Sequence, residues 1–390
     1  MTPIIPRRIK TIRTHKENGG RIAAVLPIHY PRALFRAFDI LPVEVWGPPH
    51  VDATLGSAHL QPYVCSIVRN ALAYLLSGNL DLTDLIVVPH ACDSLQGFAS
   101  ILIDFVKPTL HPERSHSERN EVESKTLLLA ERKPILPIYL PRGTRDSDLQ
   151  FLAAEFRSIY RTLTQITQRN PSDAELMVCI AREEHADDLL AELHRNRSNL
   201  PLSQSDLYRL IRSREYLPAE KFIEIVESVA RLVARPARSP QLPIILSGIV
   251  PEPMTLFDAL DAMNAYVVAD DFACCGRRLY PRGVSHDPFT RMAERILAAP
   301  PDSTRGSAIE ERAKHLESLA KTFGAKGIVF YDVKFCEPEL FYHPTLRKAL
   351  SDCGIPSVVI EFDLNDPLSQ QTQTRLEAFM EMIASVPSPL

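Results

Sequence analysis

The sequence feature that most limits the fold is a series of short, continuous apolar runs separated by helical patterns. Residues 85–89 (LIVVP) and 327–333 (GIVFYDV) are clear examples. Neither shows the alternation of apolar and polar residues that is typical of a strand with one solvent-exposed face. Strands that are apolar on both sides are typical of parallel sheets covered by helices on both faces. The connections between such strands are right-handed crossovers.

The apolar runs fall into two sets along the chain. The predicted strands are 21–28, 42–46, 85–89 and 135–140 in the first set, and 242–247, 265–269, 327–333 and 356–362 in the second. Amphipathic helical patterns separate them, for example at 61–77 and 308–323. We therefore predict an α/β protein with two doubly wound parallel-sheet domains.

The middle of the chain has helical patterns and no convincing strand before residue 242. Helices are predicted from about 145, over 173–196 and over 219–235. The predicted division is an N-terminal α/β domain (1–144), a helical region (145–238) and a C-terminal α/β domain (239–390). The first residues are expected to form a short disordered tail, and the charged segment 111–134 a surface excursion.

Charge and motif content exclude several classes of protein. A formal net charge of −4 offers no basic field for nucleic acid or for an anionic membrane. No apolar run reaches the roughly 18 residues that a membrane span requires, and no secretory signal is present, so we expect a cytoplasmic protein. The sequence has no glycine-rich phosphate loop and no GxGxxG after a strand, which argues against the usual modes of binding ATP or a dinucleotide. It also has no HExxH and no GxSxG motif.

The cysteines provide the candidate chemistry. Their odd number, seven, and their wide spacing argue against a disulfide framework. Cys92 and Cys336 each follow the third predicted strand of a set, at the carboxyl end where open parallel sheets bind ligands. Each thiol could ligate iron or act as a nucleophile, or it could be a buried structural cysteine.

Cys65 lies near the start of a predicted helix, where backbone N–H groups favour a thiolate. Taken alone, it is weak evidence for a ligand, because buried core cysteines are common. Together with Cys92 and Cys336 it offers a third thiolate from a third segment. Three thiolates can hold a cubane cluster and leave one iron free for an exchangeable ligand.

The remaining cysteines are weaker candidates. Cys274 and Cys275 follow the strand AYVVADD, but neighbouring side chains are expected to diverge, which makes them awkward joint ligands of one metal. Asp270, Asp271 and Gly276 are expected either to form a turn facing the ligand crevice or to end the strand. Cys179 and Cys353 lie in predicted helices and are interpreted as packing residues.

Several stretches match a known family. They are PIHYPRALFRAFDILPVEVWG, LIVVPHACDSLQ, LPIYLPR, SGIVPEP leading into AYVVADDFACCGRR, GIVFYDVKFCEPELFYHP, and GIPSVVIEFDLNDPLSQQTQTRLEAFMEMI. Through them the chain resembles the cluster-bearing D-component subunits of the 2-hydroxyacyl-CoA dehydratases and the ATP-dependent benzoyl-CoA reductases. The motifs run through most of the chain in the family's order.

The resemblance implies two flavodoxin-like domains plus a helical part, and a 4Fe-4S cluster bound by Cys65, Cys92 and Cys336. It implies a homologous second subunit, or pairing of the chain with itself, and an ATP-hydrolysing iron–sulfur activator protein. In the dehydratases one electron turns the thioester carbonyl of a 2-hydroxyacyl-CoA into a ketyl radical, which expels the hydroxyl group; this is lyase chemistry that requires anaerobic conditions. Such a CoA thioester is an anion and needs a local basic patch.

A departure from the family pattern bears on the site. Many relatives carry a small hydroxyl residue or a cysteine with Thr-Tyr ahead of the first conserved proline, whereas this chain has His29 in Pro27-Ile28-His29-Tyr30-Pro31. His29 and Glu44 are candidate catalytic groups in the pocket, although both could be structural. The alternatives to a dehydratase are a benzoyl-CoA-reductase-type subunit and a non-catalytic, cluster-carrying electron-transfer partner.

Overall fold

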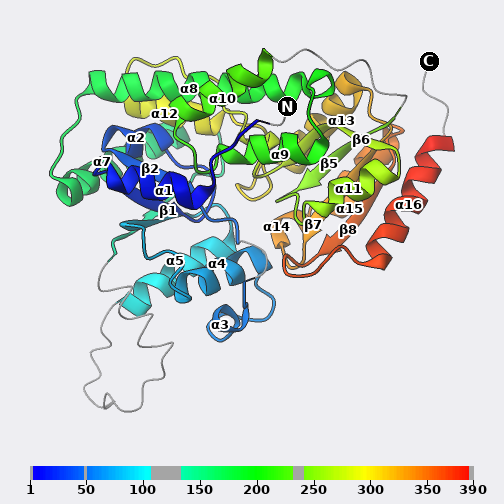
Figure 1. Cartoon of the computed structure of the whole chain (residues 1–390), viewed down its shortest axis with the longest axis horizontal. Helices are drawn as coiled ribbons and strands as arrows, with labels where there is room; N and C mark the ends of the chain where they lie inside the picture. The colour runs from blue at the N-terminus through cyan, green and yellow to red at the C-terminus, as the bar shows by residue number, and fades with distance from the viewer. Residues whose placement is uncertain (1–2, 48–50, 107–132, 232–240, 386–390) are drawn as a thin grey trace.

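The structure, a computed structural model, describes residues 3–47, 51–106, 133–231 and 241–385. Its predicted fold class is confirmed: two four-stranded parallel sheets carry helices on both faces. Figure 1 shows the two sheets side by side, with α8, α10 and α12 along one long side of the molecule. Within the described ranges no helix has the length and apolar character needed to cross a membrane.

The N-terminal half forms the first sheet. Its elements are α1 (Arg8–Glu17), β1 (Arg21–Val25), α2 (Arg32–Ala37), β2 (Ile40–Glu44), α3 (Thr54–Ser57), α4 (Ser66–Leu76), β3 (Leu85–Pro89), α5 (Asp93–Val106) and β4 (Ile135–Ile138). The strand order is β2-β1-β3-β4, and all pairs are parallel. Val25 lies opposite both Glu44 and Val87, so the carboxyl ends of β1, β2 and β3 meet at one edge.

A helical segment follows the first sheet. It contains α7 (Asp146–Thr167), α8 (Asp173–Arg195), the short 3-10 helix η2 (Arg197–Asn199), α9 (Gln204–Ser213) and α10 (Ala219–Ala230). The Ser172 side chain caps α8 by accepting from the Glu175 backbone N–H, and the Glu175 carboxylate accepts from the Ser172 N–H in return. The predicted helices are confirmed here, whereas α9 is an element that the periodicity did not single out.

The C-terminal half forms the second sheet. Its elements are β5 (Leu242–Gly248), α11 (Thr255–Ala262), β6 (Ala265–Phe272), η3 (Gly276–Arg278), α12 (Pro288–Leu297), α13 (Ile309–Phe323), β7 (Gly327–Val333), α14 (Glu337–Leu340), α15 (His343–Asp352), β8 (Ser357–Phe362) and α16 (Gln370–Ser385). The strand order β6-β5-β7-β8 repeats that of the first sheet, so the predicted pseudo-repeat is confirmed.

The two halves share their interior. One apolar core contains Ala24 of β1 and Val68 of α4 together with Leu246 of β5 and Val329 of β7. A second core packs α12, through residues such as Met292, against the N-terminal sheet and α7. The division at 144 and 238 stays a prediction, because α12 is C-terminal in sequence yet packs with the N-terminal half.

The expected disordered tail at the N-terminus is wrong for the described residues. Residues 8–17 form α1, and Ile12 packs against Ile22, Leu41 and Val43 of the first sheet. Lys16 also donates to the Asp84 carboxylate at 2.7 Å. The helix has one buried apolar residue, so its sequence lacks the stripe by which an amphipathic helix is found. The predicted excursion at 111–134 lies almost wholly outside the described residues.

Candidate functional site

Each of the three candidate cysteines lies at the start of a helix. Cys65 is the N-cap residue of α4, Cys92 directly precedes α5, and Cys336 is the N-cap residue of α14. Cys92 follows β3 and Cys336 follows β7, at equivalent places in the two sheets. The first N–H groups of a helix lack intrahelical partners, and backbone N–H groups lie against the thiols of Cys65 and Cys92, where they favour a thiolate.

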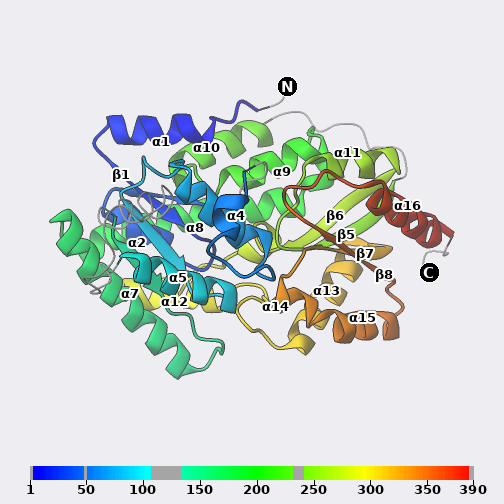
Figure 2. The same cartoon turned by 90° about the horizontal axis from the view of Figure 1, so that it is seen from below.

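Contacts between the halves hold Cys65 in place. The helix that follows it, α4, is joined to the loop after β8 by Arg69, which donates to the Asp363 carboxylate at 2.9 Å. At the next residue along the helix, the Asn70 and Asn365 side-chain amides exchange two hydrogen bonds of 3.0 Å. In both overall views α4 lies near the middle of the molecule (Figures 1 and 2). The N-terminal half therefore presents Cys65 to the C-terminal half.

The three thiols are close enough to influence one another. Burial raises the pKa of Cys336, and Cys65 and Cys92 raise it further. Burial, followed by the neighbouring Cys65, raises the pKa of Cys92 to about 12. Burial also raises the pKa of Cys65, and the Ile67 and Val68 N–H groups oppose that shift. Without a bound cation these thiols are therefore protonated, and a metal must supply the charge that makes them thiolates.

The three sulfurs do not form the ligand set of a single metal ion. They are not all within 4.8 Å of one another, as the ligands of a single ion need to be. Iron–sulfur clusters bind each thiolate to a different iron atom, which permits a wider spacing. Cys65 and Cys336 are buried in the shared apolar core, and Cys92 packs against it. This set of thiols fits a cluster.

A small pocket opens beside Cys92. It has a volume of about 140 Å³, and its lining includes His90, Cys92, Tyr139, Arg142 and Arg305. The His90 and Tyr139 rings meet edge to face, 4.6 Å apart. Two nitrogens of lining residues are buried without a hydrogen-bond partner, Nε2 of His90 and Nε of Arg305. Cys92 therefore lies at a pocket whose lining residues include two buried nitrogens without a hydrogen-bond partner.

On the other side of the site, a group of buried carboxylates surrounds Arg277. The guanidinium binds Glu339 at 2.5 and 3.1 Å, Asp302 at 3.1 Å and Asp271 at 3.2 Å. Arg312 adds a second cation, 2.8 Å from Asp271. Burial opposes ionisation of Glu339, but Arg277 and Arg312 outweigh it and lower its pKa to about 2. Sequence reasoning assigned Arg277 no role; the Gly-Arg-Arg that follows the paired cysteines was the available signal.

Asp332, Glu339 and His343 form the one set of described residues close enough to hold a single metal ion. His343 Nε2 lies 2.8 Å from Asp332 Oδ2. Arg277 and Arg312 already place two positive charges against Glu339, which disfavours a further cation there. Burial raises the pKa of Asp332 to about 6, so this carboxyl keeps its proton to a higher pH than an exposed aspartate does.

His29 links the two halves. Its side chain is fully buried, and Nε2 lies 2.9 Å from Asp302 Oδ2, so His29 joins the carboxylate group around Arg277. Nδ1 is 3.4 Å from the Tyr280 hydroxyl. Burial lowers the pKa of His29, which makes the neutral ring the resident form. The backbone φ of His29 is +62°, a left-handed value that these buried contacts maintain.

Glu44 is also fully buried and is well supplied with donors. It accepts from the Tyr30 hydroxyl and from Trp46 Nε1, both at 2.9 Å, and from Arg278 at 2.6 Å. Arg32 lies 3.6 Å away. Because Arg278 belongs to the C-terminal half, Glu44 ties the two halves together. A catalytic role for His29 or Glu44 stays a prediction.

Of the two alternatives for the aspartates of β6, a hydrogen bond supports the turn, because the Gly276 N–H donates to Asp270 Oδ1 at 2.8 Å. The strand itself runs through Asp270 and Asp271 to Phe272. The expectation about the paired cysteines is wrong. Cys274 and Cys275 do not diverge, because their sulfurs lie 3.4 Å apart in the core. The reason is local: the backbone turns sharply between the strand and η3.

The packing interpretation holds for one of the two helical cysteines. Cys179 is half-buried in α8 and packs against the second core. Cys353 caps the end of α15 and is exposed, so its assignment as a packing residue is wrong.

Comparison with known proteins gives the family. The sequence profile of "2-hydroxyglutaryl-CoA dehydratase, D-component" matches residues 27–383. The chain is 23% identical to the (R)-phenyllactyl-CoA dehydratase beta subunit of Clostridium sporogenes, over 97% of this chain and 96% of that one. It is 23% identical to the beta subunit of (R)-2-hydroxyglutaryl-CoA dehydratase from Acidaminococcus fermentans, over 95% and 94%.

A benzoyl-CoA reductase subunit of Thauera aromatica is 22% identical over 93% of this chain and 91% of its own length. The likeness therefore extends over dehydratase and reductase subunits alike, and it covers both sheets and the helices between them. The chain belongs to the 2-hydroxyglutaryl-CoA dehydratase D-component family.

Proposed function

We propose that this chain is the cluster-bearing subunit of an iron–sulfur 2-hydroxyacyl-CoA dehydratase. The observation that carries the proposal is the convergence of Cys65, Cys92 and Cys336, each at a helix start, on one buried site between the sheets. The membership of dehydratase subunits in the same family supports the choice of reaction.

In this proposal Cys65, Cys92 and Cys336 hold a 4Fe-4S cluster. The cluster, when bound, supplies one-electron transfer at low potential. The residues around it exclude water, because the side chains of Cys65 and Cys336 lie in the apolar core shared by the halves. The Cys92 side has access to solvent through the 140 Å³ pocket, which gives a substrate a way toward the site.

The protein groups near this site also hold protons in defined places. His29 is neutral and hydrogen-bonded to Asp302, and Glu44 is held by Tyr30, Trp46 and Arg278. We propose that these two side chains position the segment 27–31 rather than exchange protons with substrate, since each is buried and occupied. The reaction would remove water from a 2-hydroxyacyl-CoA through a ketyl radical of the substrate.

The proposed partners are those the reaction requires. A homologous second subunit, or a second copy of this chain, would complete the assembly. An ATP-hydrolysing iron–sulfur activator would deliver the electron, because this chain has no phosphate loop of its own.

A benzoyl-CoA-reductase-type subunit is the second candidate, favoured by the likeness to the Thauera aromatica protein. A non-catalytic subunit that carries a cluster and only relays electrons is the third. Presenting 2-hydroxyacyl-CoA and aromatic CoA thioesters to the activated complex separates the first two. A complex that binds substrate through another subunit and loses only electron transfer on Cys92→Ser would favour the third.

The cluster is tested by anaerobic purification followed by iron and acid-labile sulfide analysis. We expect iron and sulfide in the wild-type protein and their loss to background in Cys65→Ser, Cys92→Ser and Cys336→Ser. Cys179→Ser is the matched control, because Cys179 is half-buried but lies in α8, and it should keep full iron content. Iron-free wild-type protein from anoxic cells, or an equal loss in the control, would sink the proposal.

A further inference from the structure

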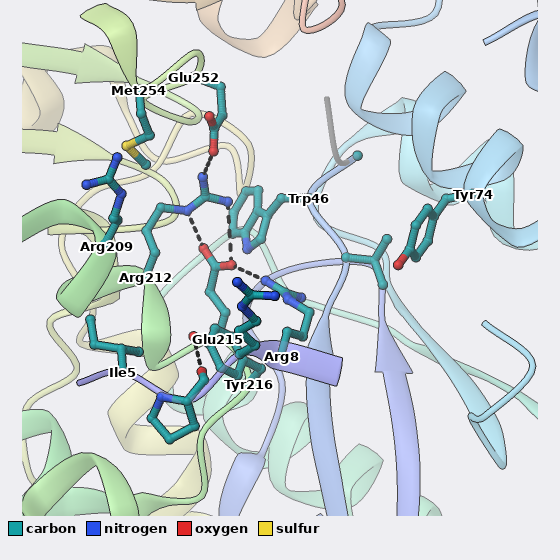
Figure 3. A pocket seen from close by; sticks show the side chains of 14 residues that line it. Ile5, Arg8, Trp46, Tyr74, Arg209, Arg212, Glu215, Tyr216, Glu252 and Met254 are labelled. Carbon is teal, nitrogen blue, oxygen red and sulfur yellow. Dashed lines mark hydrogen bonds and ion pairs between the residues drawn. The ribbon is translucent and has the colours of Figure 1, made fainter. Parts of the chain in front are cut away.

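A second, larger pocket lies between the N-terminal segment, the helical segment and the C-terminal half. Its volume is about 410 Å³, and its walls come from the end of β2, α4, α9 and the loop after β5. Figure 3 shows Arg8, Arg212 and Trp46 on one side of it and Tyr74 on the other, with the Tyr74 hydroxyl turned toward them. Neither the cysteines nor the proposed reaction accounts for this pocket.

The lining of this pocket is strongly basic for a chain with a net charge of −4. It contains four arginines and two glutamates, a surplus of two positive charges: Arg7, Arg8, Arg209, Arg212, Glu215 and Glu252. Opposing carboxylates therefore do not cancel the cations, and the surplus favours an anionic occupant.

Two of the arginines are fixed in place. Glu215 is buried and binds Arg8 at 2.7 Å and Arg212 at 2.7 Å, while Glu252 binds Arg212 from the other side. Arg8 also lies over the Tyr216 ring, 5.0 Å from its centroid. These contacts hold the two guanidinium groups in position before any ligand arrives, which lowers the entropy cost of binding one.

The other two arginines are available at the rim. Arg7 is exposed. Arg209 has a side chain that is 57% exposed, and its ion pair with Asp206 is one helical turn away on its own helix. Such exposed pairs contribute little, so a phosphate can replace Asp206 at low cost. Arginine is well suited to this task because its planar fork binds phosphate in a bidentate way.

The pocket is also next to the helix that carries Cys65. Gly47 lines it, and a Cβ on Gly47 would lie only 2.5 Å from the carbonyl oxygen of Ile67, in the first turn of α4. Tyr74, on the far wall, is nine residues after Cys65, or roughly 13 Å along a helix at 1.5 Å per residue. An anionic group bound here therefore lies beside the sulfur site and not within it.

We propose that this pocket binds the phosphorylated adenosine end of an acyl coenzyme A, with Arg7 and Arg209 closing on the phosphates and Arg8 and Arg212 forming the fixed wall. The long pantetheine arm then runs along α4 toward Cys65. The choice of coenzyme A as the source of the phosphorylated adenosine rests on the proposed function, whereas the basic lining of the pocket does not.

The only tryptophan of the chain, Trp46, lines this pocket and makes the test direct. The cluster-loaded protein is titrated anaerobically with coenzyme A, adenosine 3′,5′-bisphosphate, ATP and pantetheine, by Trp46 fluorescence and by calorimetry. We expect coenzyme A and the bisphosphate to bind and to change the fluorescence, pantetheine to bind far more weakly, and binding to weaken as salt is raised.

The double variant Arg7→Gln/Arg209→Gln removes the exposed cations and should weaken coenzyme A binding about tenfold or more. Arg161→Gln, on the exposed face of α7, is the matched control and should bind as the wild type does. Both changes are at exposed side chains, and an unchanged thermal midpoint verifies the fold.

Unchanged coenzyme A affinity in the double variant, or equal binding of pantetheine and coenzyme A, would overturn the inference. Tighter binding of ATP than of coenzyme A would assign the pocket to a free nucleotide and overturn it as well. Iron analysis keeps the two proposals separate: a protein that holds iron but fails this test keeps its proposed function and loses this pocket assignment.

Discussion

The two sheets of this protein have the same strand order, yet the thiol at the end of the third strand has different surroundings in each. Cys92, after β3, lies at the rim of a pocket with His90 and two arginines. Cys336, after β7, is 7% exposed, and Asp332 and Glu339 are among the groups that raise its pKa.

This difference shows that the position of each cysteine and the charges around it have different origins. The parallel sheet fixes where a residue after the third strand must lie, namely at the carboxyl edge. The charges around that residue come from other segments: Arg277 and Asp302 reach Cys336's side of the site, while Arg305 reaches Cys92's side. The N-terminal thiol is thereby accessible, and the C-terminal thiol lies in a closed, charge-compensated interior.

The largest effect should come from the C-terminal side. Arg277→Gln leaves Asp271, Asp302 and Glu339 buried with too little positive charge, and we expect a loss of about 3–5 kcal/mol of stability. Arg278→Gln removes the nearer cation from Glu44, which keeps the Tyr30 and Trp46 donors and the more distant Arg32, so we expect a loss of about 1–3 kcal/mol. Urea unfolding followed by circular dichroism measures both. Equal losses of stability in the two variants would contradict the expectation that the charges around Arg277 are the more strongly coupled set.

Asp332 should give the C-terminal side an unusual pH dependence. Burial raises the pKa of Asp332 from 3.8 to about 6, so between these values the folded state holds a proton that the unfolded state has lost. Stability from this group therefore falls as pH rises from about 4 to about 6, by up to about 3 kcal/mol. Asp332→Asn should remove that part of the profile. Parallel profiles for variant and wild type would contradict the assignment.

His29 should give the opposite slope on the N-terminal side. Burial lowers the pKa of His29 from 6.5, so below that value the unfolded state binds a proton that the folded state resists. The neutral ring's contribution is present above about pH 6.5 and is lost as pH falls through the lowered pKa of His29. His29→Gln should flatten this part of the urea-midpoint profile. A variant that loses stability most at low pH would show that His29 is charged in the fold.

The smallest effect should come from the exposed cysteine. Cys353→Ser should change the stability by no more than about 0.5 kcal/mol, because the side chain is exposed at a helix end. The iron content should stay at the wild-type level. Cys179→Ser should cost somewhat more, since Cys179 packs against the second core. A marked loss of iron in Cys353→Ser would mean that a fourth cysteine reaches the site.

Most of the fold was predictable because buried strands and helices have recognisable hydrophobic patterns in the local sequence. The predicted bounds of β3 and β7 match the structure, since a strand buried on both faces needs an unbroken apolar run. Helix α1 has no such hydrophobic pattern, because Ile12 and the Lys16–Asp84 ion pair are what attach it to the sheet. Helix α9 was overlooked between clearer patterns.

The site was predictable only in part, for the same reason. The positions of Cys92 and Cys336 follow from the ends of their strands, but the partners of Arg277 and the lining of the basic pocket do not. Arg8 and Arg212 are far apart in the chain, and both reach Glu215. The separation of Arg8 and Glu215 in the sequence gives no signal of their contact.

The sequence by itself therefore determined the α/β class, the two matching strand sets and the edges at which the candidate thiols lie, because hydrophobic periodicity and strand ends are properties of neighbouring residues. Only the tertiary structure decided which charges surround each thiol, how α4 contacts the C-terminal half, and where four arginines form one pocket. Ion pairs and pocket walls join residues distant in sequence, and their partners are chosen by the packing of the whole chain.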